Sequence, residues 1–232
     1  MPEQYSRLHK GEAILRLGCN LANGKVGGNS KIGCVLAIDF SKKDGDSFIS
    51  DDCFGHLCTN YGSKWQLDGR YFDGVDNYVD VGVLPKYSPS TIEAWVNSPK
   101  AQKDYAGIVF GGTGLTGWGL GIQNGATYSR ISTGDAQDNW SIEFYNEANY
   151  PAGRHQMVLT NDGAIQGYRR DGKFVSQHIN TLTNSGTAQG MSIGKWGTDL
   201  EAHSYFQGLV GKAHICNFAD YIPRILSRSI GG

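Results

Sequence analysis

Residues 70–82, with the sequence RYFDGVDNYVDVG, constrain the fold of this chain more than any other segment. An apolar run ends at Phe72 and is followed by Asp73-Gly74, which is a signal for a two-residue turn. A second run rich in β-branched and aromatic residues then ends at Gly82. The pattern predicts two β-strands joined as a hairpin.

Residues 91–96 form a second strand signal, because apolar side chains occur at every other position. Ile92, Ala94 and Val96 would lie on one face of this strand, and Thr91, Glu93 and Trp95 on the other. A strand with two different faces belongs to a sheet that buries one of its sides. We therefore interpret Trp95 as a residue that packs in the core or on a sheet face.

The rest of the chain repeats this alternation of short strands and turns. Residues 34–40 form a continuous apolar run suited to a buried strand, and the core is expected to begin there. No helical period extends beyond about ten residues, so an antiparallel two-sheet sandwich is favoured over an α/β fold. Further strands are expected at 108–110, 118–122, 140–145, 155–160, 165–170, 191–194 and 209–216.

Composition agrees with one turn-rich domain. The chain has 232 residues, a length common for a single all-β sandwich, with 33 glycines and only 6 prolines. Its formal net charge is −1, from 21 basic and 22 acidic residues, and like charges do not form runs. A phosphate backbone would find little to bind, so nucleic acid is not an expected partner.

Five segments in order resemble the laminin-G-like branch of the concanavalin-A-like lectin/glucanase superfamily. Residues 72–79 and 90–96 are similar to the family's FDGxDDYV run and FTIEAWV strand. The other three are similar to its WHHVAVT strand, its LYVDGxxV hairpin and its closing FxGxIDEVRIYN strand, at 153–160, 168–175 and 206–217. The resemblance implies an all-β, two-sheet antiparallel jelly-roll sandwich over residues 34–232. Residues 1–33 match weakly and are interpreted as an N-terminal arm or edge strand.

The cysteines offer little support for a metal site or a disulfide framework. Five scattered cysteines cannot all pair within one chain, so mostly free, buried thiols are expected, with a disulfide between two of them as the less favoured alternative. The run Cys53-x2-His56-x-Cys58 holds three soft ligands, but no second pair follows to complete a zinc site. Calcium is often bound near the closing strand in this superfamily, where the motif reads IDE. Gly211 and Lys212 stand at those carboxylate positions, so neither a metal nor a cofactor is expected.

Catalytic signals are weak. Glucanases of this superfamily use two glutamates flanking an aspartate at alternate positions of one strand. Glu143 and Glu147 have the outer spacing, but Tyr145 stands at the central position. No Gly-x-Ser-x-Gly elbow or cysteine-nucleophile signature occurs. The chain is therefore expected to be non-catalytic, with a glycoside hydrolase as a less favoured alternative.

Sugar binding is the remaining chemistry, since it needs aromatic platforms with amides and carboxylates beside them. Trp196 lies in a predicted loop with Asp199 and Tyr205 nearby, and is the leading candidate for a ligand-binding edge. Trp140 and Tyr150, each preceded by an asparagine, come second. Core packing is nevertheless the more favoured role for the aromatic residues among them, because most aromatic side chains of a sandwich are buried.

The fold alone does not name a function, because it carries lectins, adhesion modules, enzymes and structural parts. The leading interpretation is a surface-binding or structural virion component, either capsid-decorating or fibre-associated, with glycan binding as a further capacity. It rests on similar domains in phage particles and on an N-terminus without a basic segment leading into an apolar core. Residues 1–33 would then contact other virion or surface proteins in a larger assembly, with no membrane involved. The alternative is an extracellular or cell-surface lectin or adhesion domain whose leader is missing from this sequence.

Overall fold

The computed structural model describes the chain from Cys34 to Asn217 with several gaps. The described residues are 34–85, 90–99, 102, 105–112, 117–123, 126–132, 141–147, 150, 152–179, 189–196 and 205–217. Of 128–132, 141–147 and residue 189, only the backbone is described. The proposed arm at residues 1–33 lies outside this set, as do Trp140 and Asp199.

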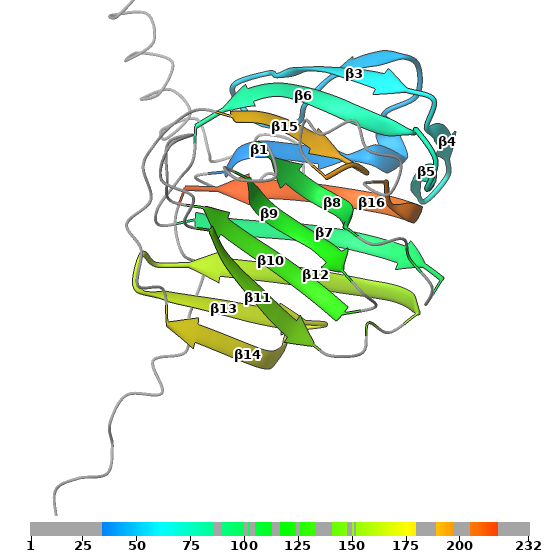
Figure 1. Cartoon of the computed structure of the whole chain (residues 1–232). Coiled ribbons are helices and arrows are strands. Elements are labelled where there is room, and N and C mark those ends of the chain that lie inside the picture. Colours follow the sequence, from blue (N-terminus) through cyan, green and yellow to red (C-terminus); the bar gives the residue numbers. More distant parts are fainter. Residues whose placement is uncertain are drawn as a thin grey trace, which may run out of the picture.

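The described strands form two eight-stranded antiparallel sheets, packed as a sandwich (Figure 1). The first, sheet A, has the order β14-β13-β12-β7-β16-β5-β4, with β1 paired to β16. The second, sheet B, has the order β11-β10-β9-β8-β15-β6-β3-β2. The predicted all-β antiparallel sandwich is thus confirmed. The strands of sheet A are β1 (Cys34–Asp39), β4 (Lys64–Gln66), β5 (Gly69–Asp73), β7 (Ser90–Ser98), β12 (Gly153–Asn161), β13 (Ile165–Arg170), β14 (Lys173–Ile179) and β16 (Gln207–Cys216). Those of sheet B are β2 (Ser47–Ile49), β3 (Leu57–Tyr61), β6 (Tyr78–Leu84), β8 (Ala106–Gly111), β9 (Trp118–Gln123), β10 (Ala126–Ser132), β11 (Ser141–Glu147) and β15 (Gln189–Ile193).

The core lies between the inner faces of the two sheets. Every residue of β1 is buried, as the apolar run predicted, and a 3-10 turn, η1 (Phe40–Lys42), follows it. The Phe40 ring makes edge contacts with Phe48 and Phe72, at centroid distances of 5.9 and 6.5 Å. Such contacts between aromatic rings add to the burial energy that holds the two sheets together.

The segment 70–82 corrects the hairpin prediction. Its two strands do form, but β5 belongs to sheet A and β6 to sheet B, so the connection crosses between the layers. The Asp73 carboxylate accepts the Val75 N–H at 2.8 Å, and Gly74 has a φ of +77°. Both Phe72 and Val79 are fully buried because they face each other's sheets across the core. The turn residues predicted the bend correctly. The sheet to which each strand belongs is determined by its partner, which is β16 for β5 and β15 for β6.

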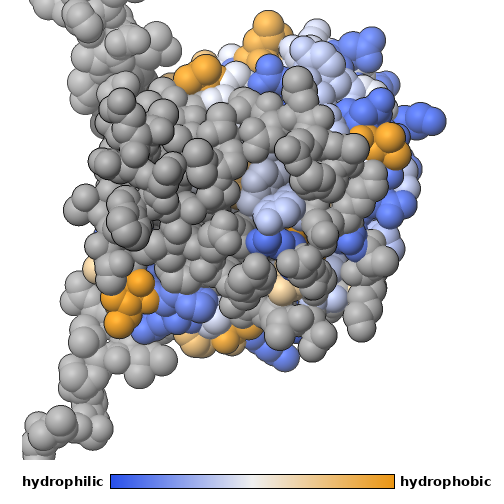
Figure 2. Space-filling model, viewed as in Figure 1, coloured by the Kyte–Doolittle hydropathy of each residue, from blue (hydrophilic) through white to orange (hydrophobic). Residues whose placement is uncertain are grey.

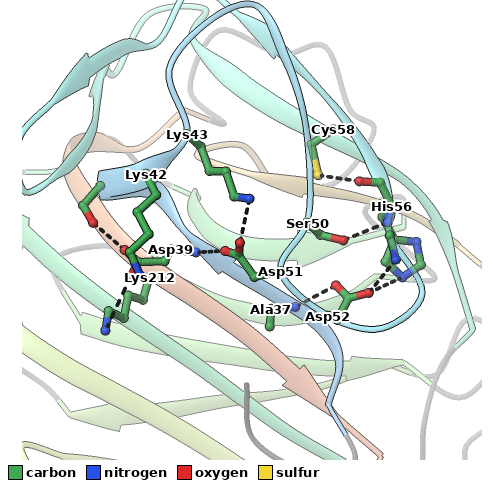
Figure 3. A network of polar contacts seen from close by, with 12 residues as sticks. Ala37, Asp39, Lys42, Lys43, Ser50, Asp51, Asp52, His56, Cys58 and Lys212 are labelled. Atoms are coloured by element: carbon green, nitrogen blue, oxygen red, sulfur yellow. Dashed lines mark hydrogen bonds and ion pairs between the residues drawn. The ribbon is translucent and has the colours of Figure 1, made fainter. Parts of the chain in front are cut away.

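The outer edge of β1 is covered by side chains of the segment 50–56 (Figure 3). Asp52 accepts the N–H of Ala37 at 3.0 Å, and Asp51 accepts the N–H of Asp39 at 2.7 Å. His56 Nε2 donates to the carbonyl of Val35 at 2.8 Å. An edge strand with open N–H and C=O groups invites pairing with other chains. The two carboxylates and the imidazole thus supply hydrogen-bond partners for the backbone groups at the outer edge of β1, where no further strand in the described part of the chain pairs.

The cysteine prediction was wrong in part. Cys34 and Cys216 form a disulfide that joins β1 to β16 across 182 residues of sequence, and Cys53 is also disulfide-bonded. Cys58 is a free, buried thiol as expected. Cys34 and Cys216 pair because the β1–β16 register sets them opposite each other, a proximity that their spacing in the sequence does not reveal.

The surface of the described residues is mixed. Figure 2 shows separate groups of apolar residues among polar ones on the face drawn. Scattered exposed apolar side chains are normal for a folded domain. No helix in the part of the chain that the structure describes is long and apolar enough to cross a membrane.

Candidate functional site

The aromatic residues that the sequence suggested for a binding edge lie in the interior where the structure describes them. Trp196 is only 3% exposed, stacks on Phe110 at a centroid distance of 3.9 Å and meets the Tyr105 ring edge-on at 5.4 Å. Tyr205 is buried beside Tyr78, and buried Tyr150 shares a 2.6 Å hydrogen bond with Ser98. None of these three rings offers an open face to a sugar.

The three soft side chains of the Cys53–Cys58 segment have other partners in the structure. Cys53 is committed to a disulfide, and His56 is hydrogen-bonded to the backbone of β1. Burial, reinforced by the nearby Asp52 charge, raises the pKa of the Cys58 thiol to about 12, so it stays protonated at neutral pH. Within the described residues, no three His, Cys, Asp or Glu side chains are placed to hold a metal ion.

The two glutamates weighed for hydrolysis, Glu143 and Glu147, lie on β11, the outermost strand of sheet B. Their backbones pair with Arg130 and Thr127 of β10. Their side chains lie outside the described part of the structure, so a catalytic role for them stays untested.

A groove on the outer face of sheet A is the candidate functional site. Its volume is about 310 Å³, and it lies over β7, β12 and β16, which are neighbours in the sheet (Figure 1). The turn between β4 and β5 forms one of its walls. The residues that line it are Asp39, Ser41, Leu67, Asp68, Trp95, Val96, Asn97, Arg154, Leu209, Gly211 and Lys212.

Trp95 provides an aromatic surface in this groove. The alternation of β7 directs Ile92, Ala94 and Val96 into the core, so Trp95 points outward and is 40% exposed. Its strand neighbours across the sheet are Lys212 on β16 and Gln156 on β12. An indole half-open to solvent in a groove can stack on an apolar ring face.

A buried carboxylate on the same face of β7 fixes the Trp95 ring. Glu93, only 3% exposed, accepts the indole N–H at 3.3 Å and the Gln156 amide N–H at 2.5 Å. The Nδ1 atom of buried His214 lies 3.3 Å from its second carboxylate oxygen. Several hydrogen bonds to one buried acceptor restrict the rotamers of its partners. The aromatic surface is therefore pre-organised, which lowers the entropy cost of binding.

Two ion pairs line the groove together with Trp95. Arg154 donates to Asp68 at 2.7 Å, and Lys212 Nζ lies 4.0 Å from Asp39. The β4–β5 turn comes close to β16 because Gly211 has no side chain: a Cβ there would lie 3.0 Å from the Asp68 carbonyl oxygen. Gly211, which replaces the aspartate of the calcium-binding motif, thus leaves room for the β4–β5 turn to form one side of the groove.

The chemistry of the groove suits a hydroxylated ring. It combines one fixed indole with the Asn97 amide, two carboxylates and two cations, so both hydrogen-bond donors and acceptors surround the aromatic surface. The sequence did not indicate this site. The alternation at 91–96 put Trp95 on the face opposite Ile92, Ala94 and Val96. It did not show that this face is exposed, or that Asp68 of the β4–β5 turn lies beside it.

Comparisons with known proteins support the fold. No known family and no curated protein matches the sequence. Domain 4 of AbnA, a GH43 extracellular arabinanase from Geobacillus stearothermophilus in complex with arabinotriose, is similar in structure. Its TM-score is 0.61 at 15% identity, over 80% of this chain and 93% of that chain.

Larger proteins share the same sandwich in part. Trypanosoma rangeli sialidase in complex with sialic acid has a TM-score of 0.60 at 14% identity, over 83% of this chain and 32% of its own. The binding domain of botulinum neurotoxin serotype D has a TM-score of 0.59 at 11% identity, over 81% of this chain and 49% of its own. The chain thus spans about a third of the sialidase and half of the toxin domain. At these identities the similarity establishes a β-sandwich fold, whereas the laminin-G-like assignment stays a prediction.

Proposed function

We propose that this chain is a non-catalytic carbohydrate-binding module whose ligand lies in the groove over Trp95. The observation that carries the proposal is the half-exposed Trp95 indole, whose N–H donates to the buried Glu93 carboxylate. The similar structures support it, since those of the arabinanase domain and the sialidase each contain a bound sugar. Cell entry of botulinum neurotoxin type C, which also has a similar structure, depends on interaction with two ganglioside molecules.

The experiment is a glycan array followed by calorimetric titration with wild type and Trp95→Ala. Burying an aromatic side chain against a ligand contributes about 1.5–3 kcal/mol. Its loss should therefore weaken binding about 10- to 100-fold. The variant should keep its fold, because Glu93 retains Gln156 and His214 as partners, but the loss of one hydrogen bond to this buried carboxylate should lower its thermal stability moderately.

Phe174→Ala is the matched control. Phe174 on β14 is 43% exposed, nearly the same as Trp95, but it does not line the groove. Equal affinity of wild type and Trp95→Ala for every glycan bound on the array would refute the proposed site.

An extracellular setting is part of the proposal. Disulfides persist in oxidising compartments and are rare in the cytosol, and the Cys34–Cys216 bond therefore supports export over cytoplasmic assembly. A virion role stays a prediction, which light scattering of untagged protein would test. A large symmetric assembly would support it, and a monodisperse monomer would contradict it.

A further inference from the structure

The charged groups of the groove are already paired. Asp39, Asp68, Arg154 and Lys212 line it, so the formal charges of its walls cancel. Arg154 Nη2 lies 2.7 Å from Asp68, and Lys212 shares Asp39 with Lys42, which approaches that carboxylate to 3.2 Å from outside the groove. A ligand therefore meets ion pairs instead of unpaired cations.

The Asp68–Arg154 pair matters most for ligand charge. A guanidinium binds a carboxylate through two parallel hydrogen bonds, which a lysine cannot do. Arg154 is the one arginine among the described groove residues, and its Nη2 donates to Asp68 Oδ2. Asp68 stands on the β4–β5 turn and Arg154 on β12, on opposite sides of β7 and β16 in the sheet. The pair thus reaches across the groove face.

The Asp68–Arg154 ion pair contributes little to the stability of the folded domain. Both side chains are more than half exposed, and such pairs contribute little to folding. Its position in the groove gives it a different effect. Asp68 accepts from Arg154 Nη2, so a ligand carboxylate or sulfate must displace Asp68 to bind the guanidinium through that nitrogen. An anion that binds another edge of the guanidinium is repelled by the Asp68 charge.

We infer that Asp68 is a specificity-determining residue that occupies the Arg154 guanidinium, so that the groove takes uncharged glycans and excludes acidic ones. The inference rests on the proposed function and names the ligand class of the same site. Neutral sugars need donors and acceptors for their hydroxyls, and the paired side chains with Asn97 supply both.

The test uses an array of matched neutral and acidic glycans, with titration of galactotriose and trigalacturonic acid, which differ by their C6 carboxylates. Wild type should bind the neutral member of such pairs at least tenfold more tightly. Asp68→Asn should reduce this ratio at least tenfold by raising affinity for the acidic member. Asp68→Ala is the second variant, because an asparagine oxygen can still accept from Arg154.

Asp162→Asn is the control for net charge. Asp162 is an exposed turn residue far from the groove lining, and asparagine keeps an oxygen for the N–H groups of Ala164 and Ile165. The inference fails if wild type prefers acidic glycans. It also fails if the ratio of neutral to acidic affinity in both Asp68 variants equals that in Asp162→Asn. Absence of any Trp95-dependent binding on the array would overturn the proposed function as well, so the two failures can be told apart.

Discussion

Asp39, at the end of β1, lies in one wall of the groove with its carboxylate 10% exposed. Burial raises the pKa of this carboxyl, but the Ser41 hydrogen bond at 2.6 Å and the ammonium groups of Lys42 and Lys212 outweigh it. The pKa of Asp39 in the folded protein is therefore lower than its ordinary value. The folded state binds the ionised form better than the unfolded chain does.

This shift predicts a pH dependence. The stability that ionised Asp39 contributes is fully present above its unfolded pKa of about 3.9, and is lost as pH falls through the lowered folded pKa. Asp39→Asn removes this titration, so its free energy of unfolding should fall less steeply below about pH 4 than that of wild type. Urea titrations from pH 2 to pH 7 measure both curves. Parallel curves would contradict the assignment, and Asp162→Asn is the control.

Two tryptophans, Trp196 and Trp95, show how far the exposure of a side chain can be predicted from the sequence. Trp196 stands among turn-forming residues, which indicated a loop, but Phe110 of β8 covers its face. Trp95 stands in a strand pattern and yet faces the groove. In both cases exposure depends on strands remote in sequence, whose positions local patterns do not define. The alternation at 91–96 correctly separated the two faces of β7 but could not show which one meets solvent.

At the scale of elements, β1 depends on side chains for its outer edge. Asp52 accepts three backbone N–H groups, those of Ala37, Phe54 and Gly55, at 3.0, 2.9 and 3.1 Å. A single carboxylate therefore ties the strand to the segment that covers it (Figure 3). Strand signals in the sequence located β1, but this covering by residues 50–56 has no periodic pattern and was not foreseen.

Asp52→Ala should expose this dependence. Leaving buried donors without acceptors costs about 1–3 kcal/mol per group, and partial hydration of the outer two reduces the sum. We expect a loss of about 2–4 kcal/mol in the free energy of unfolding, measured by urea denaturation. Asp52→Asn keeps one acceptor oxygen and should lose less. A change below about 0.5 kcal/mol in Asp52→Ala would mean that β1 is not held by this carboxylate.

For the whole molecule, the order of the strands matters more than their location. Most strands of the sandwich were predicted within a few residues, because their alternation and turns are local. Assignment of β5 and β6 to different sheets was not predicted, since the turn at Asp73-Gly74 suits a hairpin as well as a crossover. The groove could not be predicted for the same reason, because it forms only when β4, β5, β7, β12 and β16 take their final order in the sheet.

The Cys34–Cys216 disulfide should stabilise the whole sandwich. It closes a loop with a sequence separation of 182, and such long loops give the largest reduction in unfolded-state entropy. Replacing both cysteines by serine should lower the free energy of unfolding by about 2–5 kcal/mol. Urea denaturation of the double variant measures this loss, and reduction of the variant with dithiothreitol isolates the contribution of the Cys53 bond. An unchanged midpoint in the double variant would contradict the expectation.

The same bond also determines how the domain responds to mechanical tension. Cys34 and Cys216 are the first residue and the last but one that the structure describes, and they are covalently joined. Tension applied at these two residues is therefore carried by one sulfur bridge and bypasses the strands between them. The sheets and the groove stay unloaded, so the domain can keep a bound ligand under such tension.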